Sequence, residues 1–324
     1  MKFDRTEQNL ASSPAFRAVL HRTMTNWSAW LDAQLSAGAV RRARQAPSLL
    51  LPIRWIETAQ AAIRVLDSGG DKPCIVLSPD GPNVIEHYED VIGLLVPHFR
   101  VLCFDMPGFG FSAPGSTYDH SLQRGAAAML EIMDILEVAK ATLALSCANG
   151  FYAIRLAQIA PHRVERLVLS QTPSLQAMHR WTDQVVPRAL KVPFIGQLLS
   201  RVFRQKMASA WYRIALPKTT PVKPFASVAR QALRCGGCFS LAGVVQGLLR
   251  EPTDAARLRN VPCTVLWGTQ DHSHRLTQPM AILDDVPHAQ VVLLDDCGHF
   301  PDLESPQRFL LAVLSGQAAL DPQA

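Results

Sequence analysis

The sequence contains no long hydrophobic run and no apolar segment at its start. About eighteen consecutive apolar residues are needed to span a bilayer, and the apolar stretch at residues 48–53 is far shorter. Residues 1–10 also lack the apolar core of a signal peptide. Hydrophobic residues nevertheless make up 48% of the chain, and the mean hydropathy is +0.08. These features predict a globular protein with a large core and no membrane span.

Disulfide and nucleic-acid signatures are missing as well. The seven cysteines are odd in number and scattered along the chain, which argues against a disulfide framework. We therefore expect a reduced, cytoplasmic protein. The net charge of +5 includes only two small basic clusters, at residues 41–44 and 201–206. Because nucleic-acid surfaces need a longer basic stripe with interleaved aromatic residues, we expect no nucleic-acid partner.

Cofactor signatures are equally scarce. Gly108 and Gly110 lack the third glycine of a dinucleotide-binding loop. Cys235 and Cys238 have the spacing of a metal knuckle, but no second pair accompanies them. We expect neither a cofactor nor a metal.

Short apolar runs alternate with helical patterns over most of the chain. This alternation predicts an α/β fold with a mostly parallel sheet that helices cover on both faces. It is interrupted after the sixth strand by a stretch with an all-helical pattern. We predict a helical extension at residues 1–50, a core at 51–172 and 261–324, and a helical cap at 173–260. The strands are predicted at residues 53–56, 62–66, 74–78, 100–105, 141–146, 166–170, 263–269 and 290–294.

The cap is expected to lie over the carboxyl edge of the sheet, where open α/β sheets bind ligands. It should then form a largely apolar pocket. Eight cap residues are expected to line this pocket or to support it: Phe194, Ile195, Leu198, Leu199, Val202, Phe203, Trp211 and Tyr212. In the N-terminal extension, Trp27 and Trp30 are expected to pack on the core, with the active-site entrance and a partner chain as the alternatives.

Residues 141–150 join a predicted strand to a predicted helix through a short turn that holds two nucleophilic side chains. This arrangement is typical of a nucleophile elbow, usually written G-x-S-x-G. With Ser146 at the apex, small alanines occupy the two glycine positions. With Cys147 at the apex, Leu145 and Asn149 occupy them instead.

Residues 105–112, Asp-Met-Pro-Gly-Phe-Gly-Phe-Ser, match the pattern D-x-P-G-x-G-x-S without a gap. With this loop and the elbow, residues 53–316 resemble capped α/β-hydrolases of the esterase, epoxide-hydrolase and haloalkane-dehalogenase type. In that family a proline follows the nucleophile by fourteen residues, and Pro161 lies fourteen residues after Cys147. The resemblance favours Cys147 as the nucleophile, with Ser146 as the alternative. Epoxide and haloalkane chemistry would need an aspartate at the apex, and none is present.

The resemblance also implies the partners of the nucleophile, which follow in the order acid, then histidine. Asp271 ends a W-G-x-x-D pattern, and His299 lies in a C-G-H-x-P pattern. The backbone N–H groups of Gly81 and Ala148 are the implied oxyanion donors. The family's H-G-x-P loop reads Pro-Asp-Gly-Pro here, so Asp80 either orders the loop or is a second catalytic acid or base.

A thiol beside an imidazole at a helix N-terminus should ionise below its ordinary pKa of about 8.5. We therefore predict an acyl-transfer enzyme, a hydrolase of an apolar ester, lactone or thioester that forms a thioester intermediate on Cys147. Its substrate is an apolar small molecule or a carrier-bound acyl group. One alternative is an acyltransferase or cyclase with the same triad. Another is a non-catalytic ligand-binding protein on a hydrolase scaffold, suggested by Leu145 and Asn149. A homodimer is left open.

Overall fold

A computed structural model describes residues 27–38, 40–41, 44, 53–253 and 257–318. In this part of the chain, one large sheet has the strand order β1-β2-β4-β3-β7-β8-β10-β11, with the short β6 paired to β2. Neighbouring strands are parallel from β4 to β11. The strand β2 pairs antiparallel with both of its neighbours, β1 and β4. The strands are β1 (Ile53–Glu57), β2 (Ala61–Asp67), β3 (Cys74–Ser78), β4 (Arg100–Phe104), β6 (Ala113–Pro114), β7 (Ala141–Ser146), β8 (Val164–Ser170), β10 (Cys263–Gly268) and β11 (Gln290–Leu294).

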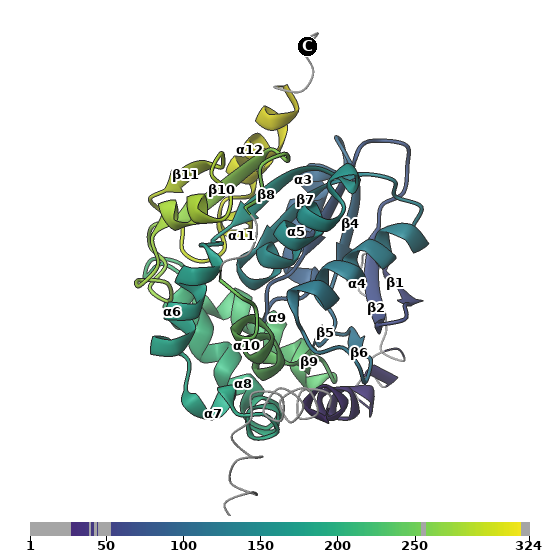
Figure 1. Cartoon of the computed structure of the whole chain (residues 1–324), viewed down its shortest axis with the longest axis vertical. Coiled ribbons are helices and arrows are strands. Elements are labelled where there is room, and N and C mark those ends of the chain that lie inside the picture. Colours follow the sequence, from purple (N-terminus) through teal and green to yellow (C-terminus); the bar gives the residue numbers. More distant parts are fainter. Residues whose placement is uncertain (1–26, 39, 42–43, 45–52, 254–256, 319–324) are drawn as a thin grey trace, which may run out of the picture.

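Two apolar cores lie on opposite faces of this sheet. Successive strand side chains point to opposite faces, so Ile75 and Leu77 enter one core while Val76 enters the other. Helices α4 (Leu122–Ile135) and α5 (Cys147–Ile159) cover the Val76 face, and α3 (Glu89–Leu95) and α12 (Pro306–Ala318) cover the other (Figure 1). The predicted fold class, a mostly parallel sheet between two helical layers, is confirmed.

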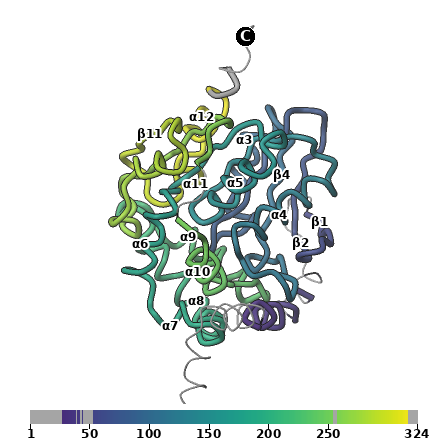
Figure 2. The backbone as a smooth tube through the Cα atoms, in the orientation of Figure 1, coloured from purple at the N-terminus to yellow at the C-terminus, as the bar shows by residue number. Residues whose placement is uncertain are grey.

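The stretch between β8 and β10 is helical over most of its length. Its helices are α6 (Leu175–Val185), α7 (Arg188–Lys191), α8 (Ile195–Ala215), α9 (Val222–Arg234) and α10 (Leu241–Leu249). We call residues 173–260 the helical insertion. It lies at one end of the molecule, with α12 at the opposite end (Figure 2). One expectation is wrong, because β9 (Cys238–Phe239) pairs with β5 (Phe109–Gly110), so the insertion is not all helical. The predicted division into domains stays a prediction.

The short elements complete the fold. The 3-10 helices are η1 (Ile85–Tyr88), η2 (Pro161–Arg163) and η3 (Pro279–Asp284), and α11 (Pro301–Glu304) precedes α12. In the described part of the chain, no helix combines the length and the apolarity needed to cross a membrane.

The N-terminal extension is described only in part. Residues 27–38 are helical, and most of the remaining extension predicted for 1–50 lies outside the described residues. The expectation that Trp27 and Trp30 pack on the core is wrong. Their side chains are 55% and 45% exposed and contact each other edge to face, with ring centroids 6.0 Å apart. This helix instead buries its other side, including Asp32.

Candidate active site

The turn between β7 and α5 has the backbone geometry of a sharp elbow. Cys147 is the first residue of α5 and has φ of +47°, in the left-handed region that side chains other than glycine rarely adopt. Gly150 allows close packing behind the turn, because a Cβ atom there would lie 2.2 Å from Oγ1 of Thr172. The Thr172 hydroxyl donates to the carbonyl of Cys147 at 3.2 Å. The end of the neighbouring strand β8 thus supports the elbow.

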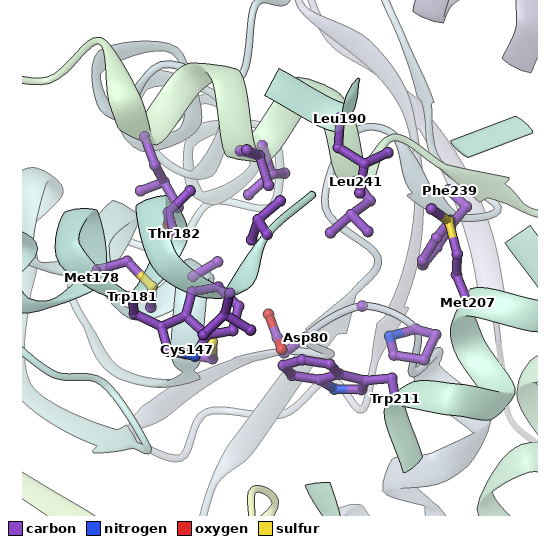
Figure 3. A pocket seen from close by; sticks show the side chains of 18 of the residues that line it. Asp80, Cys147, Met178, Trp181, Thr182, Leu190, Met207, Trp211, Phe239 and Leu241 are labelled. Carbon is purple, nitrogen blue, oxygen red and sulfur yellow. The ribbon is translucent and has the colours of Figure 1, made fainter. Parts of the chain in front are cut away.

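The two candidate nucleophiles point in different directions. Cys147 lines a cavity and is 7% exposed (Figure 3). The Ser146 hydroxyl instead donates to Oδ2 of Asp302 at 2.9 Å. The Tyr88 hydroxyl donates to the same oxygen at 2.6 Å. Ser146 is therefore held within a buried hydrogen-bond network, away from the cavity lining.

His299 and Asp271 form a buried pair next to Cys147. Nδ1 of His299 lies 2.7 Å from Oδ2 of Asp271, which also accepts a hydrogen bond from Gln171 at 2.9 Å. Burial alone would raise the pKa of Asp271, but the imidazolium charge of His299 and hydrogen bonds from His299 and Ser273 lower it to about 2. Burial disfavours the charged imidazolium and would lower the pKa of His299. The charge of Asp271 and its hydrogen bond to the ring instead hold this pKa well above its ordinary value.

Asp80 faces the opposite nitrogen of the same imidazole. Its Oδ2 lies 3.6 Å from Nε2 of His299, too far for a direct hydrogen bond, and this nitrogen has no hydrogen-bond partner among the described residues. The carboxyl group points into the cavity, close to Trp211 (Figure 3). Burial raises the pKa of Asp80, and the charge of His299 only partly offsets this.

His274 is a residue that the sequence analysis did not place in the site. Its Nε2 lies 4.0 Å from Sγ of Cys147, and its ring stacks on Trp181 with centroids 4.7 Å apart. Burial, and then the charge of His299, lower its pKa to about 3, so the ring is neutral. The available signal was its position three residues after Asp271, in the loop that follows the same strand.

The expected low pKa of Cys147 is wrong for this structure. Burial first, and then the charge of Asp80, raise it to about 11 against the opposing effect of His299. An apolar cavity disfavours an ion, and the sequence could not show that a carboxyl group would lie next to the thiol. The resting side chain is a neutral thiol.

Gly81, one of the two predicted oxyanion donors, lies in the loop after β3, and the other, Ala148, is the second residue of α5. Gly81 and Ala148 both line the cavity with Cys147. A side chain at Gly81 would clash with Phe109, because a Cβ atom would lie 2.3 Å from its ring. Asn149, which departs from the usual glycine, donates to the Pro79 carbonyl at 3.0 Å. Its side chain therefore ties the elbow to this loop.

The cavity has a volume of about 410 Å³ and is largely apolar, as expected. Among the described residues that line it, none is lysine or arginine, and Asp80 is the one acidic residue. The walls come mainly from the helical insertion and include Met178, Trp181, Val185, Leu190, Met207, Trp211, Ile214, Phe239, Leu241, Val245 and Leu248.

Most of the eight insertion residues expected at the pocket lie elsewhere. Trp211 lines the cavity. Tyr212 is buried behind it and donates to Oδ1 of Asn83 at 2.7 Å. The N-terminal half of α8 turns its apolar side chains outward, so the expectation is wrong for Ile195, Leu198, Val202 and Phe203, which are exposed.

Comparisons with known proteins agree with this fold. Residues 75–312 match the sequence model of the alpha/beta hydrolase family. The chain is 31% identical over 270 residues to a 2-hydroxy-6-oxo-2,4-heptadienoate hydrolase of Pseudomonas putida, covering 79% of this chain and 92% of that protein. It is 24% identical to a 2-hydroxymuconate semialdehyde hydrolase of a Pseudomonas strain, over 84% of this chain and 95% of that protein.

Among solved structures, epoxide hydrolase A of Mycobacterium thermoresistibile has a TM-score of 0.69 at 17% identity. That likeness covers 83% of this chain and 98% of the other, and it concerns the fold alone. The family model matches more than half of the chain, and the parallel sheet agrees with it, so the chain belongs to the alpha/beta hydrolase family. Its membership of this family identifies it as an enzyme of the alpha/beta hydrolase class.

Proposed function

We propose that this protein is an acyl-ester or thioester hydrolase with Cys147 as nucleophile, His299 as acid–base and Asp271 as the group that orients His299. The observation that carries the proposal is the placement of Cys147. Its thiol stands at a left-handed turn at the start of α5 and faces an apolar cavity, with the buried His299–Asp271 pair beside it. Ser146 is already engaged by Asp302.

The reaction begins when sulfur attacks the substrate carbonyl carbon and the carbonyl oxygen becomes an oxyanion. The N–H groups of Gly81 and Ala148 are the proposed donors to that oxygen. The thiol proton passes to the Asp80–His299 pair and then to the departing alcohol or thiol as the carbon–oxygen or carbon–sulfur bond breaks. A water molecule attacks the thioester, which releases a carboxylic acid and restores the thiol.

We assign Asp80 a role in the proposed reaction because of the charges around the Cys147 thiol. Cys147 is neutral at rest, with a pKa of about 11, so its proton must leave as the new bond forms. The carboxyl of Asp80 and Nε2 of His299 lie 3.6 Å apart on the same side of the site. Because the raised pKa of His299 keeps its imidazole protonated, the carboxylate of Asp80 is the member of the pair that can accept the thiol proton, which makes Asp80 the proposed second acid–base group.

The cavity walls support an uncharged acyl substrate. A carboxylate on the substrate would find no lysine or arginine among the described cavity residues, and it would face Asp80. Burying an unpaired charge in apolar surroundings is costly. The name of the Pseudomonas putida relative describes a dienoate, which is a carboxylate. We therefore propose that this protein acts on a neutral ester or thioester with an apolar acyl chain.

Trapping of the acyl-enzyme tests the nucleophile. The purified protein is mixed with p-nitrophenyl hexanoate and quenched in acid, and its peptides are analysed by mass spectrometry. We expect the hexanoyl mass on the peptide containing Cys147. Cys147→Ala should lose both label and turnover, while the matched Ser146→Ala variant should keep them. Label that persists in Cys147→Ala and disappears in Ser146→Ala would move the nucleophile to Ser146.

The same experiment separates the alternatives. Hexanoic acid as the product supports hydrolysis. A hexanoyl product that forms only with an added alcohol or thiol indicates an acyltransferase instead. Binding of the ester without any acyl-enzyme or product would indicate a ligand-binding protein.

A further inference from the structure

Three metal-ligand atoms, from Cys147, His274 and His299, converge at the buried end of the cavity, and the carboxylate of Asp80 lies next to one of them. Sγ of Cys147 lies 4.0 Å from Nε2 of His274, and Nε2 of His299 lies 3.6 Å from Oδ2 of Asp80. The donor atoms of Cys147, His274 and His299 all lie within 4.8 Å of one another. Thiolate, imidazole and carboxylate are the three kinds of ligand that zinc takes in proteins.

Both histidines are held so that Nε2 faces this point. Nδ1 of His299 is bonded to Asp271 at 2.7 Å, and Nδ1 of His274 lies 3.3 Å from the Thr277 hydroxyl. The Thr277 hydroxyl donates to the His274 carbonyl at 2.9 Å, so its oxygen is free to accept the Nδ1 proton of His274. Such outer partners fix the ring orientation of metal-binding histidines. Nε2 of His299 is fully buried and has no hydrogen-bond partner among the described residues.

The charges around this point also favour a cation. The carboxylates of Asp80 and Asp271 are both buried and flank the single imidazole of His299. Among the described residues that line the cavity, no lysine or arginine balances the second carboxylate. Binding would release the thiol proton of Cys147 and the Nε2 proton of His299 to solvent, and the divalent ion with Asp80 and the thiolate would then be electrically neutral.

We propose that Cys147, His274, His299 and Asp80 form a binding site for a divalent zinc-type ion, which enters through the cavity and blocks the thiol. Zinc–nitrogen and zinc–sulfur bonds of about 2.0–2.3 Å put neighbouring donors of a tetrahedral site roughly 3.3–3.6 Å apart. The spacings of 3.6 and 4.0 Å, and the 4.8 Å limit that contains the donors of Cys147, His274 and His299, exceed these values by up to about 1.5 Å, so the side chains must move inward to close around the ion.

The expected consequence is inhibition rather than metal catalysis. Four protein ligands fill a tetrahedral zinc ion and leave no open position for a substrate or a water molecule. The metal would also occupy the sulfur lone pair that attacks the carbonyl and the nitrogen that carries the proton. Ion binding follows from the geometry, whereas the loss of turnover rests on the proposed function.

Cobalt(II), a coloured substitute for zinc, tests the ligand set without any substrate. The full-length protein is stripped with a chelator, desalted and titrated with cobalt(II) while its absorbance spectrum is recorded. We expect one ion per chain, with a sulfur-to-cobalt charge-transfer band and intense tetrahedral bands. Cys147→Ser should lose the charge-transfer band, whereas Cys235→Ser, which alters an exposed thiol, should keep it.

Variants of the other ligands complete the test. His274→Gln and Asp80→Asn should each weaken binding by about tenfold or more, and circular dichroism shows whether each variant is folded. Two variants keep the test decisive if one of them fails to fold. The proposal is overturned if the wild type shows no charge-transfer band, if Cys147→Ser keeps it, or if every folded ligand variant binds as tightly as wild type.

Inhibition is measured separately with p-nitrophenyl hexanoate. The rate of each protein at increasing zinc is divided by its own rate in chelator. Half-inhibition of the wild type should occur at the zinc concentration that half-fills the site, and His274→Gln should need about tenfold more. If the ion binds to Cys147 while turnover continues unchanged, the inhibition and the assignment of Cys147 as nucleophile fail, but the metal site stands.

Discussion

Nδ1 of His299 lies 2.7 Å from Oδ2 of Asp271, and both side chains are buried. This contact fixes the imidazole so that Nε2 faces Cys147 and Asp80. Asp271 is itself held by Gln171 and Ser273, which leaves it little freedom to rotate. Asp271 therefore holds His299 rigidly in the orientation that any reaction at Nε2 of His299 requires.

The first prediction is that Asp271→Asn lowers kcat for p-nitrophenyl hexanoate by roughly 10³–10⁴-fold. An amide can hold the ring in the wrong tautomer and cannot stabilise the imidazolium. Steady-state kinetics measures the effect, and Asp296→Asn, a change to a surface carboxylate, should leave kcat unchanged. A loss of less than tenfold would show that Asp271 does not orient a catalytic histidine.

The second prediction concerns substrate charge. Mono-p-nitrophenyl adipate has the acyl length of p-nitrophenyl hexanoate and carries a carboxylate at its far end. Because the apolar cavity offers no cationic partner, kcat/KM should be roughly 100-fold lower for the adipate, which corresponds to about 3 kcal/mol. Rates without enzyme correct for intrinsic reactivity. Equal kcat/KM values would contradict the proposal of a neutral substrate.

The third prediction tests the packing behind the elbow. Gly150→Ala places a Cβ atom 2.2 Å from Oγ1 of Thr172 and should destabilise the fold by roughly 1–3 kcal/mol. Adding Thr172→Ala should recover part of this loss. Gly93→Ala in α3 is the control, since a Cβ atom there meets nothing within 4 Å. Urea unfolding measures these three variants and Thr172→Ala alone, and additive effects at Gly150 and Thr172 would contradict the contact.

The fourth prediction concerns the dependence of stability on pH. Burial raises the pKa of Asp32 from 3.8 to about 7, against hydrogen bonds from Gln197 and Ser240. Because the folded pKa is the higher one, the folded state binds a proton that the unfolded state loses. The resulting stability is complete below pH 4 and disappears as the pH rises through 7.

Asp32→Asn removes this titration. The stability of the variant relative to wild type should therefore rise by up to roughly 4 kcal/mol between pH 4 and pH 9. Urea unfolding at both pH values measures the difference, and Asp71→Asn, a change to an exposed acid, is the control. A constant difference between Asp32→Asn and wild type across this range would show that Asp32 does not titrate there.

The sequence by itself determined the order of the elements and several of their bounds. The predicted strands 74–78, 141–146 and 290–294 coincide with β3, β7 and β11, because each is an apolar run bounded by polar or turn residues. The sequence also singled out Asp271 and His299, which meet at 2.7 Å. The resemblance to capped α/β-hydrolases identified them, through the W-G-x-x-D and C-G-H-x-P patterns. Each residue follows a parallel strand, and the ends of such strands gather at one edge of a sheet.

Only the tertiary structure decided what surrounds the thiol. Nothing in the order of residues shows that Ser146 turns to Asp302 while Cys147 turns to the cavity, because that depends on the left-handed turn. His274 lies in the loop after β10 and stacks on Trp181, which belongs to an element far away in sequence. The thiol pKa rises for the same reason: burial and the nearby Asp80 are properties of packing, and packing brings together residues that no local pattern connects.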